Sequence, residues 1–272
     1  MAGRPPPKKS LGQHFLNDPG ILRRIVELAR VGPGDRVLEI GPGPGGLTEA
    51  LLGAGAGVLA IEADGRMVEH LESRGLAGLH LLHRDALKTD YLSLALETGG
   101  RFKLVANLPY NISGPLLAKL LREREAFTDM TLMFQREVAE RIAAGPGGKE
   151  RGILGVLAQA FCQIEKGFRL PPGAFRPPPK VESMVIRLRV LDTPLIRLAN
   201  EELLWKIVHE AFQKRRKQLR NCLRHRLTDP EAFFAALGLT GTERPEELPT
   251  LKWLELANLL ALNPAGIETK DL

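Results

Sequence analysis

Cysteine is scarce in this chain of 272 residues, which contains only Cys162 and Cys222. The two lie far apart in the sequence and have neither the paired spacing of a zinc site nor that of a redox motif. The six histidines show no metal-ligand spacing, and no Ser-His-Asp or Cys-His set stands out. The sequence therefore predicts no metal site and no nucleophilic hydrolase, and its low cysteine content is typical of a reducing, cytoplasmic compartment.

Long apolar runs are also missing. No stretch approaches the roughly 20 residues needed to cross a bilayer. The start of the chain is rich in proline and lysine and lacks the apolar stretch of a signal peptide. We therefore expect a soluble, intracellular protein with no membrane association.

Acidic residues are absent from one strongly basic segment. Residues 212–226 contain seven Lys and Arg residues and no Asp or Glu, in a chain of net charge +6 and pI near 9.5. Clustered cations predict a polyanionic partner, and we expect RNA. The RNA-binding candidates are Lys214, Arg215, Arg216, Lys217 and Arg220.

Short apolar runs alternate with helical patterns over the first two thirds of the chain. Strands are expected at 36–41, 57–62, 78–83, 102–106 and 129–134, and helices at about 19–30, 46–54, 65–74, 114–123 and 135–144. This alternation predicts an α/β fold with a doubly wound, mostly parallel sheet. Strands over 181–190 and near 159–168 would close it with an antiparallel edge.

The pattern changes near Thr193-Pro194, where strands end and amphipathic helices begin. Helices are expected at 201–211, 214–227, 230–237 and 251–261. We therefore divide the chain into an α/β domain at 1–193 and a small α-helical carboxyl-terminal domain at 194–272. Residues 1–12 are expected to form a mobile basic arm.

A glycine-rich turn follows the first expected strand of the sheet. Gly41, Gly43 and Gly46 satisfy the dinucleotide-binding pattern, so a nicotinamide-linked oxidoreductase must be weighed. However, Pro42 and Pro44 remove two backbone N–H groups that a pyrophosphate would need at a helix start. The turn therefore favours a ligand without phosphate there, such as S-adenosylmethionine.

The tetrapeptide Asn107-Leu108-Pro109-Tyr110 follows another expected strand, where α/β folds place their ligands. An exocyclic amine attacks poorly unless acceptors hold its N–H groups as positive charge develops on nitrogen. Asn107 offers a side-chain carbonyl, the stiff Leu108-Pro109 bond directs a backbone carbonyl, and Tyr110 offers a flat face for a purine. The motif predicts methylation of a nucleobase amine.

Three further residues are candidates for ligand contacts. Glu62 ends a strand about 20 residues past the glycine turn, where an acid accepts from ribose hydroxyls. Asp85 could accept from the adenine amine of the cofactor, or could simply be a turn aspartate. Phe175 lies in a proline-rich loop and could clamp a target base opposite Tyr110, or could pack in the core.

These motifs together resemble those of the KsgA/RsmA family of small-subunit rRNA adenine dimethyltransferases, in order over nearly the whole chain. The matching segments are Gly12-Gln-His-Phe-Leu16, Leu38-Glu-Ile-Gly-Pro-Gly43, Ile61-Glu-x-Asp64, Asp85-Ala86, Asn107-Leu-Pro-Tyr-Asn-Ile-Ser113, Phe175-x-Pro-x-Pro-Lys-Val181 and Phe212-x-Lys-Arg-Arg-Lys217.

The resemblance implies a Rossmann-like class I methyltransferase domain that uses S-adenosylmethionine. It further implies dimethylation of N6 of two adjacent adenosines in a hairpin loop near the 3′ end of 16S rRNA, during assembly of the 30S subunit. We expect a monomer.

The resemblance also implies roles for particular residues. The cofactor site would comprise His14, Leu16, Gly41, Glu62, Asp85 and Asn107. Asn107 would also hold the target amine, and Tyr110 and Phe175 would sandwich the adenine. Many relatives carry Asn at the position of His14.

Three alternatives remain open from sequence. Macrolide-resistance methyltransferases of 23S rRNA share a similar site, usually with Ile in place of Leu108, and mitochondrial transcription factors share the fold. A ribosome-assembly factor could bind rRNA without methylating it. An NAD-linked dehydrogenase is supported by the glycine turn alone.

Overall fold

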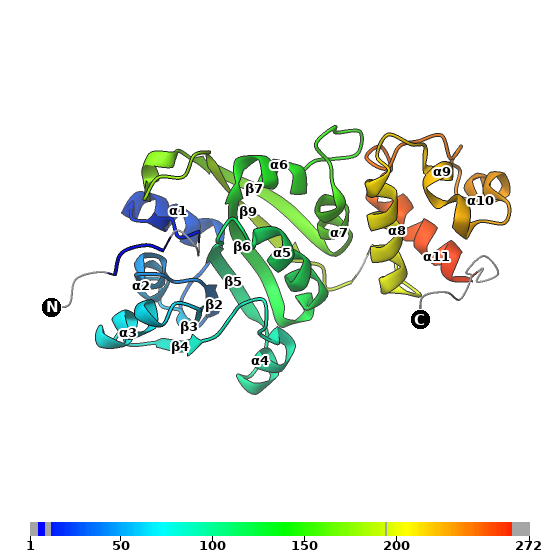
Figure 1. Cartoon of the computed structure of the whole chain (residues 1–272). Helices are drawn as coiled ribbons and strands as arrows, with labels where there is room; N and C mark the ends of the chain where they lie inside the picture. Colours follow the sequence, from blue (N-terminus) through cyan, green and yellow to red (C-terminus); the bar gives the residue numbers. More distant parts are fainter. Residues whose placement is uncertain (1–4, 9–11, 194, 263–272) are drawn as a thin grey trace. The chain divides into compact units, whose positions relative to one another are not determined.

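The computed structural model describes residues 5–8, 12–193 and 195–262, and its strands form two sheets (Figure 1). The larger sheet has seven strands in the order β4-β3-β2-β5-β6-β9-β7. The smaller pairs β1 with β8. The strands are β1 (Phe15–Leu16), β2 (Arg36–Ile40), β3 (Gly57–Glu62), β4 (Leu79–His83), β5 (Phe102–Asn107), β6 (Phe127–Gln135), β7 (Cys162–Leu170), β8 (Phe175–Arg176) and β9 (Ser183–Val190).

Helices connect the strands and fill the carboxyl-terminal part. The α-helices are α1 (Pro19–Leu28), α2 (Gly46–Gly53), α3 (Gly65–Ser73), α4 (Tyr91–Glu97), α5 (Ser113–Arg122), α6 (Arg136–Ile142), α7 (Ile153–Phe161), α8 (Glu201–Gln213), α9 (Leu219–Leu223), α10 (Pro230–Ala236) and α11 (Thr250–Leu262). Short 3₁₀ turns lie at η2 (Arg124–Ala126), η3 (Pro172–Ala174) and η4 (Arg224–Arg226).

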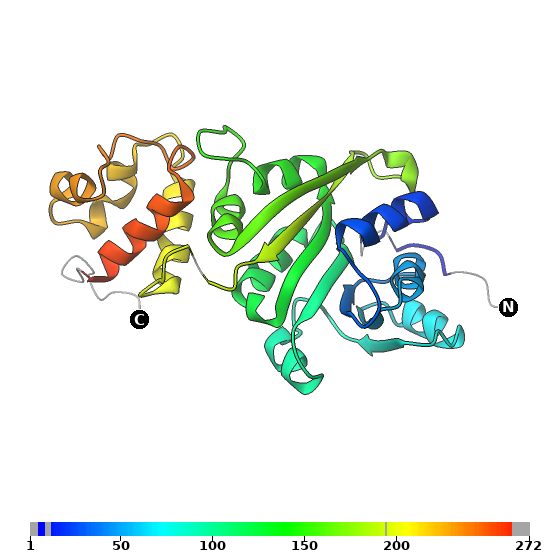
Figure 2. The same ribbon diagram turned by 180° about the vertical axis from the view of Figure 1, so that it is seen from behind.

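The sheet is parallel from β4 to β6, and β9 joins β6 in antiparallel orientation. The strand order reverses between β2 and β5, which creates a crevice at their carboxyl ends. Because crossovers are right-handed, this reversal places α2 and α3 on one face and α4 and α5 on the other. Views from opposite sides show α1 and α5 on opposite faces (Figures 1 and 2).

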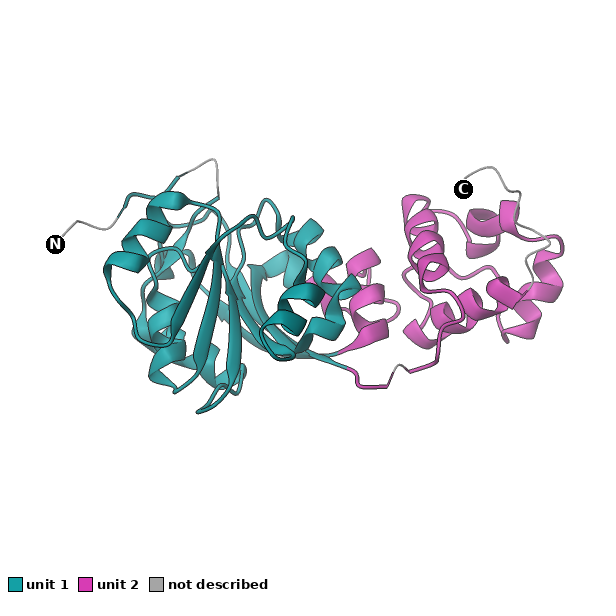
Figure 3. Ribbon diagram, turned by 90° about the horizontal axis from the view of Figure 1, so that it is seen from below, with its two compact units in different colours: residues 1–139, 163–190 teal, residues 140–162, 191–272 magenta. Residues whose placement is uncertain are grey.

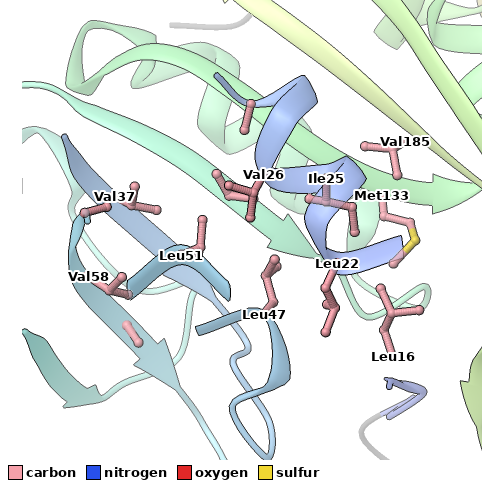
Figure 4. Close-up of a cluster of buried hydrophobic side chains, with 14 of the residues drawn as sticks. Leu16, Leu22, Ile25, Val26, Val37, Leu47, Leu51, Val58, Met133 and Val185 are labelled. Carbon is pink, nitrogen blue, oxygen red and sulfur yellow. The ribbon is translucent and has the colours of Figure 1, made fainter. Parts of the chain in front are cut away.

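The core on the α1 and α2 face is built from aliphatic side chains of helices and strands (Figure 4). Asp18 starts α1 by accepting from the N–H groups of Gly20 and Ile21, and Pro19 occupies the first turn. The helix then buries Leu22, Ile25 and Val26, which lie three to four residues apart on one face.

The chain forms two compact units, and each of them is built from two separate segments of the sequence (Figure 3). The first comprises Met1–Ala139 and Gln163–Val190, and the second comprises Glu140–Cys162 and Leu191–Leu272. The predicted division at 193/194 falls close to the third change of unit, at 190/191. It does not anticipate that residues 140–162, including α7, group with the helices that follow β9.

Most expected elements are present, with ends shifted by a few residues, but two predictions are wrong. Residues 159–161 end α7 rather than starting a strand, and β7 begins at Cys162. Residues 214–218 form a turn and not part of a continuous helix, which resumes only as the short α9. Four consecutive cations disfavour helix there, because like charges one turn apart repel.

Helices α4 and α7 and the two-residue strands β1 and β8 were not predicted. The expected arm at 1–12 lies partly outside the described residues, and within it Lys8 contacts Asp64 across 3.4 Å. Throughout the part of the chain that the structure describes, no helix is both long and apolar enough to cross a membrane.

Candidate active site

A cavity of about 240 Å³ opens at the carboxyl ends of β2, β3, β4 and β5. It brings together most residues that the sequence predicts for the site. Its wall is formed by Gly12, Gln13, His14, Phe15, Gly41, Gly43, Glu62, Ala63, Asp85, Leu87, Asn107, Leu108, Pro109, Tyr110, Asn111 and Ile112.

The glycine turn after β2 gives the cavity a wall of bare backbone. Gly41 and Gly43 have φ of +70° and +54°, which disfavours side chains larger than hydrogen. A Cβ on Gly43 would lie 3.0 Å from the ring of Phe15, whereas one on Gly41 would meet no atom within 4 Å. Gly41 therefore leaves open space in which a ligand can approach the chain.

Glu62 ends β3 with its carboxylate buried in the cavity wall. Its two oxygens accept from the N–H groups of Gly43, at 3.1 Å, and Asp64, at 2.9 Å. Burial raises the pKa of Glu62 above its ordinary value, and these hydrogen bonds partly oppose the shift. The N–H of Ala63 also bonds the carboxylate, which is thus held in one orientation and can still accept from a ligand hydroxyl.

Asp85 follows β4 and is exposed at the cavity. One of its carboxylate oxygens accepts from the N–H of Leu87 at 2.9 Å, which fixes the side chain in a turn. Its carbonyl accepts from the hydroxyl of Thr89. Asp85 is therefore a turn aspartate that also lines the cavity, and its contact with the cofactor adenine stays a prediction.

Asn107 and Tyr110 are each held by a specific hydrogen bond. The Asn107 Nδ2 donates to the carbonyl of His14 at 3.0 Å, so its Oδ1 points another way and can accept. The Tyr110 hydroxyl bonds the Ser183 Oγ at 2.5 Å, which anchors the ring to the start of β9. Burial raises the pKa of Tyr110, and the bond to Ser183 partly offsets this.

Two predicted site residues lie outside the cavity wall. Phe175 is fully buried and Leu16 is 7% exposed, and both belong to the core on the α1 and α2 face. They are paired in the β1–β8 ladder. Phe175 therefore does not face Tyr110 in this structure, and the ring that stacks on Tyr110 is that of His14.

The predicted RNA-binding residues lie in the second unit, around the turn between α8 and α9. A cavity of about 470 Å³ is lined by Phe212, Gln213 and residues 214–217. Arg215 differs from its neighbours because it donates to the carbonyls of Lys149 and Arg151, at 2.7 and 3.1 Å. Its guanidinium is engaged within the unit and is only partly available to phosphate.

Two acidic residues were missed by the sequence reasoning. Asp64 is buried, and its carboxylate accepts from Lys8, Gln13 and Arg66. The guanidinium of Arg66 is the main reason that its pKa lies far below the usual range. Asp64 thereby fixes the amino-terminal segment beside the cavity, a contact that only its place in the Ile61-Glu62-x-Asp64 motif could have suggested.

Glu39, within β2, was quoted only as part of a motif. It is buried and accepts from the Thr48 hydroxyl at 2.7 Å. Burial raises its pKa to about 8, with a further contribution from the nearby Glu62.

The charge of the cavity wall selects among ligands. Of the described residues that line it, Glu62 and Asp85 are acidic and none is Lys or Arg. Such a wall suits a cation such as a sulfonium and offers no charged partner to a pyrophosphate. No group of three His, Cys, Asp or Glu residues able to hold a metal occurs among the described residues. The fold and site are those of a class I, S-adenosylmethionine-dependent methyltransferase.

Comparisons with known proteins identify the family. Residues 6–262 match the family described as ribosomal RNA adenine dimethylase, to which this chain belongs. It is 45% identical over 254 residues to ribosomal RNA small subunit methyltransferase A of Magnetococcus marinus, covering 93% of this chain and 91% of that protein. The namesake from Pseudomonas aeruginosa is 44% identical over 261 residues, with 95% and 96% covered.

Two solved structures share the fold over nearly the whole chain. A dimethyladenosine transferase from Plasmodium falciparum superposes with a TM-score of 0.78 at 29% identity, covering 93% of this chain and 99% of that one. The 23S rRNA methyltransferase ErmE gives a TM-score of 0.71 at 26% identity, with 90% and 99% covered. The predicted KsgA/RsmA family, fold class, enzyme class and cofactor are confirmed.

Proposed function

We propose that this protein dimethylates N6 of two adjacent adenosines in a hairpin loop near the 3′ end of 16S rRNA, during 30S subunit biogenesis in the cytoplasm. The main support is the placement of Asn107, Tyr110, Glu62 and Asp85 around a single cavity without Lys or Arg. This arrangement serves two ligands, a cationic cofactor and a purine that carries an exocyclic amine.

S-adenosylmethionine supplies a methyl group made electrophilic by its sulfonium. In our proposal Glu62 accepts from the ribose hydroxyls, Asp85 from the adenine amine, and the backbone at Gly41 lies against the ligand. The observed geometry favours this, because the Glu62 carboxylate is already oriented by two backbone donors and Gly41 faces open space. Leu16 would contribute through its backbone, since its side chain is in the core, whereas His14 lines the cavity.

The target amine is activated by acceptors. The Asn107 Oδ1 and a backbone carbonyl of the Leu108-Pro109 segment hold the two N–H groups and stabilise positive charge as it develops on N6. Tyr110 stacks on the adenine and sets the distance of attack. Because a methylated exocyclic amine is cationic and strongly acidic, its proton leaves to water, and no side chain is needed as a base.

Substrate choice would depend on the second unit. The exposed cations Lys214, Arg216, Lys217 and Arg220 would contact rRNA phosphates, which position the enzyme without reading sequence. We expect the protein to act as a monomer on the small subunit or its precursor.

The test is incubation of the purified protein with labelled S-adenosylmethionine and small subunits that lack the modification. Mass analysis of the nucleosides should yield N6,N6-dimethyladenosine, and mapping should place it at two adjacent residues of 16S rRNA. Label found in 23S rRNA would favour the activity named for ErmE. Firm binding to subunits without transfer of label would favour an assembly factor that does not methylate.

A further inference from the structure

The face of Tyr110 is covered by an aromatic ring from the same chain. The His14 imidazole lies on the phenol with ring centroids 5.5 Å apart and planes 26° from parallel. Its Nδ1 donates to the carbonyl of Pro177 at 2.8 Å. Both rings line the cavity that contains Asn107.

The two rings leave no room for a third between them. Two successive stacks at a carbon–carbon contact of about 3.5 Å would place the outer rings about 7 Å apart. The observed centroid distance is 5.5 Å, so an adenine cannot stack on this face of Tyr110 while His14 remains there. Tyr110 itself is anchored through its hydroxyl to Ser183, which leaves His14 as the ring that moves.

We propose that His14 occupies the target-base site of the empty enzyme and that the flipped adenine displaces it. This inference rests on the proposed function and adds to it a side chain that competes with the target base. The imidazole keeps Tyr110 stacked and its site free of other planar ligands. A base must therefore replace one stack and one hydrogen bond before it can present its amine to Asn107.

The contacts of His14 allow its side chain to leave while its backbone stays. The carbonyl of His14 is held by Asn107 Nδ2 at 3.0 Å, and the neighbouring Gln13 is tied to Asp64 at 3.2 Å. Phe15, on the other side, begins the β1–β8 ladder. Rotation of the imidazole about its own bonds breaks only the stack and the bond to Pro177, so Asn107 keeps its orientation throughout.

The energetic penalty of displacing His14 is the same for every base, so bases differ in affinity only through the stacking and hydrogen bonds that each regains in the site. A purine stacks over a larger area than a pyrimidine. Only a base with an exocyclic amine regains hydrogen bonds at the Asn107 side chain. Guanine and cytosine also carry an exocyclic amine, so their exclusion depends on where that amine lies and not on the His14 ring.

The test compares wild type, His14→Ala and His14→Phe in methylation of unmodified small subunits at saturating S-adenosylmethionine. His14→Ala should lower the KM for subunits by roughly 5- to 100-fold, the range expected for removing one competing stack. His14→Phe should raise it or leave it unchanged, because a larger ring competes at least as well. His80→Ala, a matched change at an exposed strand position outside the cavity, should have no effect.

Changes in KM opposite to those expected would overturn the proposal. A higher KM in His14→Ala that His14→Phe restores would mean that the ring stacks on the bound adenine instead of making way for it. Calorimetry of S-adenosylmethionine binding provides a second check, since a change confined to cofactor affinity would assign His14 to the cofactor site alone. If wild type binds cofactor but no form yields dimethyladenosine, the proposed function fails and this inference falls with it.

Discussion

At the scale of single residues, the most unusual group is the buried carboxyl of Glu39. Its pKa of about 8 in the folded protein exceeds the ordinary value of 4.5 because burial disfavours the charged form. A carboxyl with a raised folded pKa contributes its full stability below pH 4.5 and loses it as pH rises through 8. The wild-type protein should therefore become less stable across this window.

Glu39→Gln should remove that loss. The amide oxygen can still accept from Thr48, and the side chain cannot ionise. We expect the variant to gain stability over wild type as pH rises from 5 to 8, by up to a few kcal/mol. Thermal unfolding followed at several pH values checks this, and parallel curves for the two proteins would mean that Glu39 does not titrate in this range.

Glu62 should matter for the cofactor and not for RNA. Glu62→Ala leaves two ribose hydroxyls without an acceptor, which should weaken S-adenosylmethionine binding by about 1–3 kcal/mol per unmatched group. Calorimetry measures the affinity, and binding to subunits serves as the control. Unchanged cofactor affinity would exclude Glu62 from the site.

Two substitutions of Tyr110 separate the contribution of its ring to activity from that of its hydroxyl. Tyr110→Phe keeps the stacking face and loses the bond to Ser183, a cost of about 1 kcal/mol. It should retain most activity in single-turnover methylation. Tyr110→Ala should lose about 1–3 kcal/mol of base placement. If the two variants were equally impaired, the hydroxyl rather than the face would be the working group.

At the scale of elements, we expect the cations of the basic turn between α8 and α9 to have two roles, stabilising the second unit and binding RNA. Arg215, Arg216 and Lys217 are all exposed, but Arg215 also donates to the carbonyls of Lys149 and Arg151. Arg215→Ala should lower the free energy of unfolding by about 1 kcal/mol, because the exposed carbonyl of Lys149 and the half-buried carbonyl of Arg151 lose a charged donor.

The matched variant Arg216→Glu/Lys217→Glu should be altered in RNA binding and not in stability. Its stability should equal that of wild type, and its binding to subunits should weaken with a smaller dependence on salt. Filter binding at several salt concentrations, together with denaturant unfolding, separates the two variants. An unchanged salt dependence would place the RNA surface elsewhere on the protein.

Elements with a local signal could be predicted from the sequence. The strands of the parallel sheet are buried apolar runs, and the start of α1 is indicated by Asp18 as N-cap followed by Pro19. Helix α4 was missed although Asp90 caps it by accepting from the N–H of Ser93, a signal that could have been used. Helix α7 is apolar on nearly all sides, so it has no amphipathic period and resembled a strand.

The site was predictable where it depends on strand ends, and not where it depends on contacts between distant segments. Glu62, Asp85 and Asn107 follow successive strands, so the topology brings them together. The β1–β8 ladder joins residues about 160 positions apart, and no local pattern encodes it. That ladder buries Phe175, which is why this ring is in the core and His14 is over Tyr110.

At the scale of the whole molecule, the second unit depends on a segment that precedes β7. Helix α7 packs on α8 and α11, and the buried Arg151 bonds the carbonyl of Leu248 and, at 2.6 Å, the hydroxyl of Thr250. A fragment of residues 194–272 would lack these partners, so we expect it to be largely unfolded. Circular dichroism with thermal unfolding tests this, and a cooperative transition would show that the fragment folds alone.

Because the second unit is built from two separate segments, it cannot be completed until late in synthesis. Helix α7 leaves the ribosome roughly 100 residues before α11 is complete, which at 5–20 residues per second is a delay of roughly 5–20 s. During that time Val156, Leu157 and Phe161, all buried in the finished protein, lack the cover that α11 provides. The nascent chain therefore carries an incompletely covered apolar helix, a natural target for a chaperone near the tunnel exit, until its last helix has been synthesised.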